Sequence, residues 1–332
     1  MKTKLTLLCS AVLATSFLHA QEGLSKAEDV KEIQKRTIIV VTEEVNEKLA
    51  AKLEGDQQAQ YKKDIEDYNA AIKEAVPGFW TFNKEIEYKT RAEVDKLTKA
   101  KNKKYAYIEY NKFTVNTANA AAYKSTYQFK EGAKDITFVG GDYNCTNLNI
   151  RLCDENPLGP PVYGVRLPNP FPDKTDLANA LKSMQLQFGY KLDGKKDIPI
   201  FNMFKDNAKA LTGLTLLVNE TNTDLKIEDI KKAYPHPVEL VSKAKIDEAI
   251  LKSDDKTAFV HVIPNEGSSY SFYILSAKDA TVLGYTNDTQ STGVKVGGLV
   301  GGTAGTALAL NKEMTKRKVK KDHFKIFAKH VK

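Results

Sequence analysis

Residues 89–110 read KTRAEVDKLTKAKNKKYAYIEY, and residues 241–263 read VSKAKIDEAILKSDDKTAFVHVI. Each stretch offers a helix start at Thr90 or Ser242, then a short helix, a Lys-rich turn and a strand of aromatic or β-branched residues. Matching positions differ by 152 or 153 in number, so a single gap aligns the two copies. This repeat predicts two tandem copies of one α/β unit.

The flanking sequence extends each copy to the same order of elements. A buried strand and a helix precede each repeated stretch, while further strands and a closing helix follow it. The predicted order in both units is β-α-β-α-β-β-β-α, a mixed sheet packed by helices. The first unit is expected to begin with a strand at 37–41, and the second with a strand at 214–218.

The expected domain organisation follows from these elements and from the loops between them. Residues 1–20 are predicted to be a signal peptide and 21–35 a leader. The first α/β unit would occupy 36–205, with a loop elaboration at 111–172 that includes a strand centred on 136–139. The second unit would occupy 206–332, with a Gly-rich insert at 289–311.

The amino end has the pattern of an export signal. Lys2 and Lys4 precede an apolar run from Leu5 to Leu18, and a small residue, Ala20, stands before Gln21. No other segment has the roughly 18 apolar residues of a membrane helix. We therefore expect an exported protein, periplasmic or on the periplasm-facing side of the outer membrane, without a transmembrane helix in the mature chain.

Two cysteines remain after the signal, Cys145 and Cys153. In an oxidising compartment such a pair commonly forms a disulfide. The segment between them would then be a bent hairpin closed at its base. A zinc site is the weaker alternative, because no histidine lies near them in sequence.

Composition and motifs argue against most enzyme classes. The formal net charge is +8 and is supplied mainly by lysine, which permits anionic partners, of which nucleic acid is the least expected for an exported chain. Zinc-protease, serine-hydrolase and phosphate-loop motifs are missing from the sequence. Asp95 and Asp247 occupy equivalent helix positions, where solvated carboxylates are ordinary. We expect no catalytic residue, cofactor or metal.

A Gly-rich run near the carboxyl end has two interpretations. Gly297, Gly301 and Gly305 are four apart, which on a helix gives a smooth face for self-association or membrane contact, and so allows a homo-oligomer. The simpler interpretation is a connection between the last hairpin and the last helix. The basic tail that follows could bind an anionic surface through Lys316, Arg317, Lys318, Lys320 and Lys321, or pack its apolar stripe on its own sheet.

Aromatic residues near the first repeat allow a further hypothesis. Phe79, Trp80 and Phe82, together with Tyr105, Tyr107 and Tyr110, could line a carbohydrate or peptide groove. Core packing explains the same residues more simply.

The order of elements resembles the amino-terminal α/β domain of the TolB family. It is also similar to the curli-pore family of CsgG and to outer-membrane activators of peptidoglycan synthases. The hairpin Tyr270–Tyr285, with its turn at Ser276–Ala280, is the most similar stretch. Where that group often has Gly-Ser at the end of the third strand, this chain has Glu109-Tyr110 and Ile263-Pro264. The chain as a whole also resembles exported proteins of the Bacteroidota.

The resemblance implies a role in an envelope assembly. We expect a non-catalytic binding or scaffolding protein whose partner is an envelope protein, peptidoglycan or the outer-membrane surface. The alternative is a membrane-associated, self-associating protein that uses 297–305 and the basic carboxyl-terminal helix.

Overall fold

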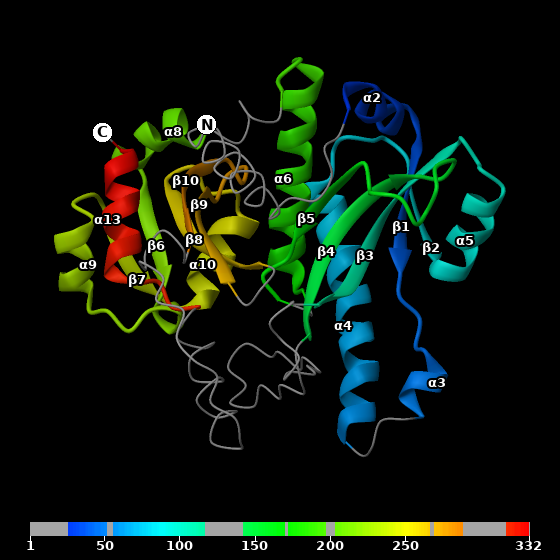
Figure 1. The fold of residues 1–332 in the computed structure, drawn as a ribbon, viewed down its shortest axis with the longest axis horizontal. Coiled ribbons are helices and arrows are strands. Elements are labelled where there is room, and N and C mark those ends of the chain that lie inside the picture. The colour runs from blue at the N-terminus through cyan, green and yellow to red at the C-terminus, as the bar shows by residue number, and fades with distance from the viewer. Residues whose placement is uncertain are drawn as a thin grey trace, which may run out of the picture.

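The computed structural model describes residues 26–51, 56–116, 142–169, 172–196, 203–265, 269–287 and 317–331. The described residues form two five-stranded sheets, one in each unit. Read from the edge where neighbouring strands are parallel, each sheet has the second strand of its unit at the edge, followed by the first, third, fourth and fifth strands. The prediction of two tandem α/β units is confirmed (Figure 1).

The first unit follows the predicted order of elements. A short helix, α2 (Ala27–Lys35), precedes it and packs Val30 and Ile33 into its core. The unit then consists of β1 (Thr37–Thr42), α3 (Glu47–Ala50), α4 (Asp56–Phe79), β2 (Ile86–Thr90), α5 (Arg91–Lys99), β3 (Tyr105–Asn116), β4 (Asp142–Leu152), β5 (Tyr163–Arg166) and α6 (Lys174–Leu192).

The second unit repeats this order, with shorter helices after its first and fifth strands. It begins with α8 (Phe204–Asn207) and a 3₁₀ turn, Ala208–Thr212. It continues through β6 (Thr215–Asn219), a 3₁₀ turn (Glu220–Asn222), α9 (Ile227–Ala233), β7 (Val238–Val241), α10 (Lys243–Leu251), β8 (Thr257–Asn265), β9 (Ser269–Ser276), β10 (Val282–Asn287) and α13 (Lys321–His330).

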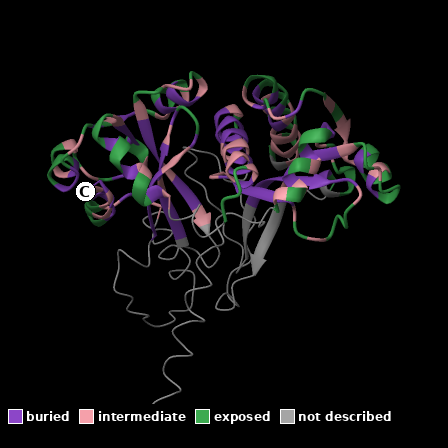
Figure 2. Cartoon of the chain, turned by 90° about the horizontal axis from the view of Figure 1, so that it is seen from above, coloured by how far each residue is buried: buried purple, intermediate pink, exposed green. Residues whose placement is uncertain are grey.

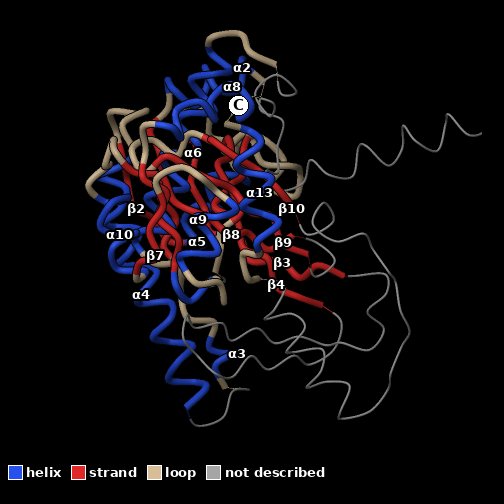
Figure 3. The backbone as a smooth tube through the Cα atoms, turned by 90° about the vertical axis from the view of Figure 1, so that its left-hand side faces the viewer, coloured by secondary structure: helices blue, strands red, loops and turns tan. Residues whose placement is uncertain are grey.

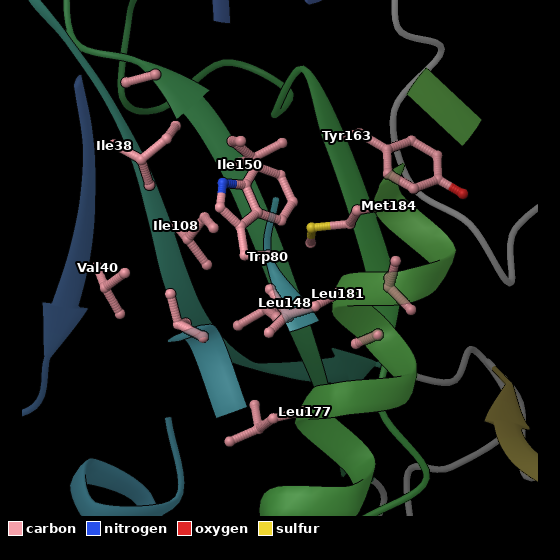
Figure 4. Close-up of a cluster of buried hydrophobic side chains, with 14 of the residues drawn as sticks. Ile38, Val40, Trp80, Ile108, Leu148, Ile150, Tyr163, Leu177, Leu181 and Met184 are labelled. Carbon is pink, nitrogen blue, oxygen red and sulfur yellow. The ribbon is translucent and has the colours of Figure 1, made fainter. Parts of the chain in front are cut away.

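Helices cover both faces of each sheet, because alternate strand residues point to opposite faces. In the first unit, α2, α4 and α6 bury one face, and Figure 4 shows the cluster in which Trp80 lies among Ile108, Ile150 and Met184. The indole Nε1–H of Trp80 donates to Asn83 Oδ1 at 3.1 Å, so this large side chain is buried without an unpaired donor. Helix α5 covers the opposite face, around Val94 and Tyr107.

In the structure, the two copies of the repeat correspond residue by residue without the gap that the sequence alignment needs. Thr37 N donates to Lys104 O, and Thr215 N donates to Lys256 O, so Lys104 corresponds to Lys256. Lys101 and Ser253 occupy the same turn, with φ of 48° and 52°. The pairs Lys104–Lys256 and Lys101–Ser253 both differ by 152, so the expected gap is wrong. It arose from matching residue classes, which placed Tyr105 on Ala258 where the hydrogen bonds place it on Thr257.

The cysteine segment is a strand, and the expected hairpin there is wrong. β4 pairs with β3 without a break from Ala106↔Leu152 to Asn116↔Asp142, and it is the counterpart of β9. Residues 142–152 and 163–166 are therefore strands of the sheet, at the positions that β9 and β10 occupy in the second unit. Beyond Ile108, β3 pairs with β4 alone, and Figure 3 shows the two strands running out past the helices. The strand expected around 136–139 lies outside the described residues.

Helix α6 joins the two units. Its apolar side chains, among them Leu181 and Phe188, pack in the first core. From its other side the buried Lys182 donates from Nζ to Ile250 O at 2.6 Å and to Ala277 O at 2.9 Å, both in the second unit. Lys243 Nζ also donates to Asp173 Oδ2 at 2.8 Å. Most of α6 is consequently buried (Figure 2).

Candidate binding site at the carboxyl edge of the first sheet

The connections of the first sheet diverge between β1 and β3. The chain leaves β1 through α4 on one face and leaves β2 through α5 on the other, while β1 lies beside both β2 and β3. Ligands of open α/β sheets bind outside the carboxyl ends of the strands at such a divergence. Glu43 follows β1 there, Arg91 begins α5, and Glu109 lies in β3.

Glu109 is the centre of an ionic cluster at this edge. Arg151 of β4 donates from Nε to Glu109 Oε1 at 2.6 Å, and Arg91 donates from Nη1 to Glu109 Oε2. Arg151 Nη1 also donates to the carbonyl of Gly159 at 2.5 Å. Glu109 and Arg151 are buried, and a buried carboxylate is stable only when paired in this way. Arg91 and Arg151 each bond one carboxylate oxygen of Glu109, so the positions of both guanidinium groups are fixed.

The backbone of Glu43 is held by two hydrogen bonds, while its carboxylate makes only a long contact with the described residues. Glu43 N donates to Asn69 Oδ1 at 2.9 Å, and Asn69 Nδ2 donates to Glu43 O at 2.9 Å. The carboxylate Oε1 lies 3.5 Å from Arg91 Nη2. Burial raises the pKa of Glu43, and the nearby Arg91 only partly opposes that effect. Its side chain is 26% exposed, so the carboxylate can still meet a ligand from solvent.

Tyr68 adds a buried hydroxyl on the α4 side of the same sheet edge. The residue is 4% exposed, and within the described part of the chain its hydroxyl has no hydrogen-bond partner. Its ring lies 4.9 Å from that of Tyr110, the residue after Glu109. Burial raises the pKa of Tyr68 well above its usual value, and the charge of Glu43 adds to the increase. An unpaired buried hydroxyl costs about 1–3 kcal/mol, which a ligand or water would recover.

We name Glu43, Tyr68, Arg91, Glu109 and Arg151 the carboxyl-edge cluster. The second unit has no such cluster among the described residues at the equivalent positions. Lys243 replaces Arg91 but bonds Asp247 at 2.7 Å and Asp173.

Other members of the carboxyl-edge cluster have uncharged counterparts in the second unit. His261 replaces Glu109, and burial lowers its pKa to about 4, which leaves it uncharged near neutral pH. Leu275 replaces Arg151, as the strand registers show. The charged edge is therefore a property of the first unit.

The two cysteines do not come together. Cys153 carries a free thiol, buried beside Ile39 and Tyr107. Cys145 lies near the start of β4 and Cys153 directly after its end, so eight residues of extended strand separate their backbones by roughly 26 Å. A disulfide requires Cα atoms within about 7 Å. An intrachain Cys145–Cys153 bond is thus incompatible with the paired strand.

The apolar stripe of the carboxyl-terminal helix packs on its own sheet, as the simpler interpretation expected. Phe324 and Phe327 of α13 are fully buried in the second core. Among the basic residues, Lys318 Nζ lies 3.0 Å from Asp224 Oδ1, and Arg317 lies over the ring of Tyr270. Lys320 and Lys321 lie at the start of the helix. Lys316, Gly297, Gly301 and Gly305 are outside the described residues.

The aromatic residues do not share one groove. Trp80 is buried in the core under α4 and α6, whereas Tyr107 is buried on the opposite face under α5. Tyr105 lies on the face of Tyr107, and Tyr110 lies on the face of Trp80, because alternate residues of β3 point in opposite directions.

The residues of the carboxyl-edge cluster were not predicted as a site. The available signal was a charged residue, Glu109, in an otherwise aromatic and aliphatic strand. A second signal was the ionisable residues directly after predicted parallel strands, Glu43 after β1 and Arg91 after β2. Tyr68 gave no signal, since a tyrosine on the apolar stripe of a helix is ordinary core.

Within the described ranges, no group of His, Cys, Asp and Glu side chains is arranged to hold a metal ion. None of the described helices has the length and apolar character needed to cross a membrane. No family model, curated protein or solved structure matches the chain.

Proposed function

We propose that this chain is an exported cell-envelope protein with a non-catalytic binding or scaffolding role, and that its first unit supplies the binding site. The supporting observation is the difference between the units. They share one strand order, yet only the first has the carboxyl-edge cluster. The resemblance to the TolB family and the predicted signal peptide are the reasons for placing the protein in the periplasm or on the periplasm-facing outer membrane.

The second unit would act as the support. Lys182 and Lys243 link it to α6 through buried or partly buried polar contacts. These contacts would hold the second unit in place while the first unit meets an envelope protein or peptidoglycan. Nucleic acid is not proposed as a partner.

Site-directed photocrosslinking in the intact envelope tests this role. A photoreactive residue at Glu44, beside Glu43 and exposed, should give a discrete crosslinked product. The matched position is Glu220, which is exposed directly after β6 in the second unit. We expect Glu220 to give no product of the same size. Equal crosslinking from both positions, or none from Glu44, would overturn the assignment of binding to the first unit.

A further inference from the structure

We propose that Glu43 and Tyr68 bind the ammonium group of a ligand at the carboxyl edge of the first sheet. The inference rests on the proposed function, because it assigns a ligand class to the same edge. It depends on the two members of the carboxyl-edge cluster whose polar atoms are least engaged by the protein.

The first step concerns the division of contacts within the cluster. Glu109 receives both guanidinium groups, one on each carboxylate oxygen. Among the described residues, the carboxylate of Glu43 contacts only Arg91, at 3.5 Å, which is beyond the usual length of a charge-assisted bond. Glu43 therefore retains most of its capacity to accept hydrogen bonds, while Glu109 does not.

The second step concerns the sign of the ligand's charge. Besides burial, the carboxylates of Glu109 and Glu44 raise the pKa of Glu43, and Arg91 is the cation that lowers it. The carboxylate of Glu43 is negatively charged and can only accept hydrogen bonds, so it pairs with a cationic donor rather than with an anion. A cation would recover the interaction that Glu43 lost on burial.

The third step concerns Tyr68. Its hydroxyl is almost fully inaccessible to solvent and has no partner among the described residues. A hydroxyl accepts as well as donates, and an ammonium group has three donors and no acceptor. The charge of Glu43 acts on Tyr68, so the two groups are near each other, and one ammonium can donate to both. Asn69, next to Tyr68 in α4, already fixes the backbone of Glu43, so the two acceptors are held by the same turn of helix.

The test is a titration of the purified protein with propylammonium chloride, followed by NMR at the backbone amides of Glu43 and Arg91. We expect saturable shifts at both amides. Sodium chloride at equal ionic strength and 1-propanol, which has the same carbon chain with a hydroxyl, should give no saturable shift.

Variants identify the residues responsible. Glu43→Gln should weaken propylammonium binding about tenfold or more, since it removes a charge-assisted bond. Tyr68→Phe should weaken it about threefold, the effect of one modest hydrogen bond. The matched control is Glu66→Gln, the same chemical change at an exposed position of α4, which should bind like the unmodified protein.

Several outcomes would overturn the inference. These are equal binding of 1-propanol, unchanged affinity in Glu43→Gln, or equal loss in Glu66→Gln. The inference and the proposed function can fail separately. Crosslinking at Glu44 that persists in Glu43→Gln would keep the binding role and reject the ammonium assignment. Propylammonium binding without a crosslink at Glu44 would keep the ammonium assignment and reject the binding role.

Discussion

Glu109 accepts hydrogen bonds from two guanidinium groups at once, and this makes it the most sensitive residue of the carboxyl-edge cluster. We predict that Glu109→Gln lowers the free energy of unfolding by about 3–5 kcal/mol, because it leaves Arg151 buried without its countercharge. Chemical denaturation measures the change. Glu248→Gln, which breaks the exposed Glu248–Lys252 pair, should cost less than about 1 kcal/mol. Losses of similar size in the two variants would contradict the prediction.

Cys153 gives a second prediction at the residue scale. Burial raises the pKa of its thiol to about 12, so almost no thiolate is present near neutral pH. In a Cys145→Ser variant, Cys153 should resist alkylation by iodoacetamide at pH 8 until denaturant unfolds the protein. Mass spectrometry counts the added groups. Rapid labelling of the folded variant would show that the thiol is accessible.

The limits of sequence reasoning are clear for individual residues. The Thr90 capping box was predictable, because its partner Glu93 stands three residues away, and it is present. The ionic contacts of Glu109 were not predictable in the same way. Arg151 is 42 residues away and reaches Glu109 only through the register of β3 and β4.

At the scale of elements, Lys182 of α6 links the two units by its hydrogen bonds to the second unit. Burial lowers the pKa of this lysine to about 8, below its unfolded value near 10.4. Between these values the unfolded chain binds more protons than the folded chain, so stability should rise with pH from about 8 to 10. Lys182→Met should abolish this rise. Denaturant unfolding at the two pH values measures it, and an unchanged pH dependence in the variant would reject the role of Lys182.

The contact between β10 and α13 depends on Gly284. A Cβ built there would lie 3.2 Å from Ile274 Cδ1 and 3.3 Å from Phe327 Cδ1. Gly284→Val should therefore displace Phe327 and lower the free energy of unfolding by about 1–3 kcal/mol. Chemical denaturation again measures the loss. Gly213→Val is the matched control, since its Cβ would meet only Ala210 O at 3.8 Å.

Element order was predictable because hydrophobic periodicity and turn residues are local signals. The positions of strands in the region 111–172 were less predictable. Asn144, Asn147 and Asn149 interrupt the apolar pattern of β4, so the strand resembled a loop. Long-range pairing with β3 outweighs this low strand propensity.

For the whole molecule, burial of α13 decides how the membrane alternative can be tested. Removing the carboxyl-terminal residues would also remove Phe324, Phe327 and Val331 from the second core. A truncated chain that fails to float with vesicles could therefore be unfolded rather than unable to bind. A point change in the Gly-rich run is the better experiment.

We predict that the full chain does not float with anionic vesicles, and that Gly301→Glu behaves identically. Flotation of the full chain that is lost in Gly301→Glu would instead support the membrane-associated alternative. Lys96→Gln, which also lowers the charge by one unit and lies on an exposed face of α5, controls for electrostatic effects.

The burial of α6 between the two units has a consequence for folding during synthesis. Domains generally fold as units, amino-terminal first, as a chain is made. The first core is complete once residue 192 has emerged, when α10 and the β9–β10 turn do not yet exist. During that interval the side of α6 that bears Lys182 stands in water. A lysine there remains soluble on the nascent chain, whereas an apolar side chain would invite aggregation before its partner is made.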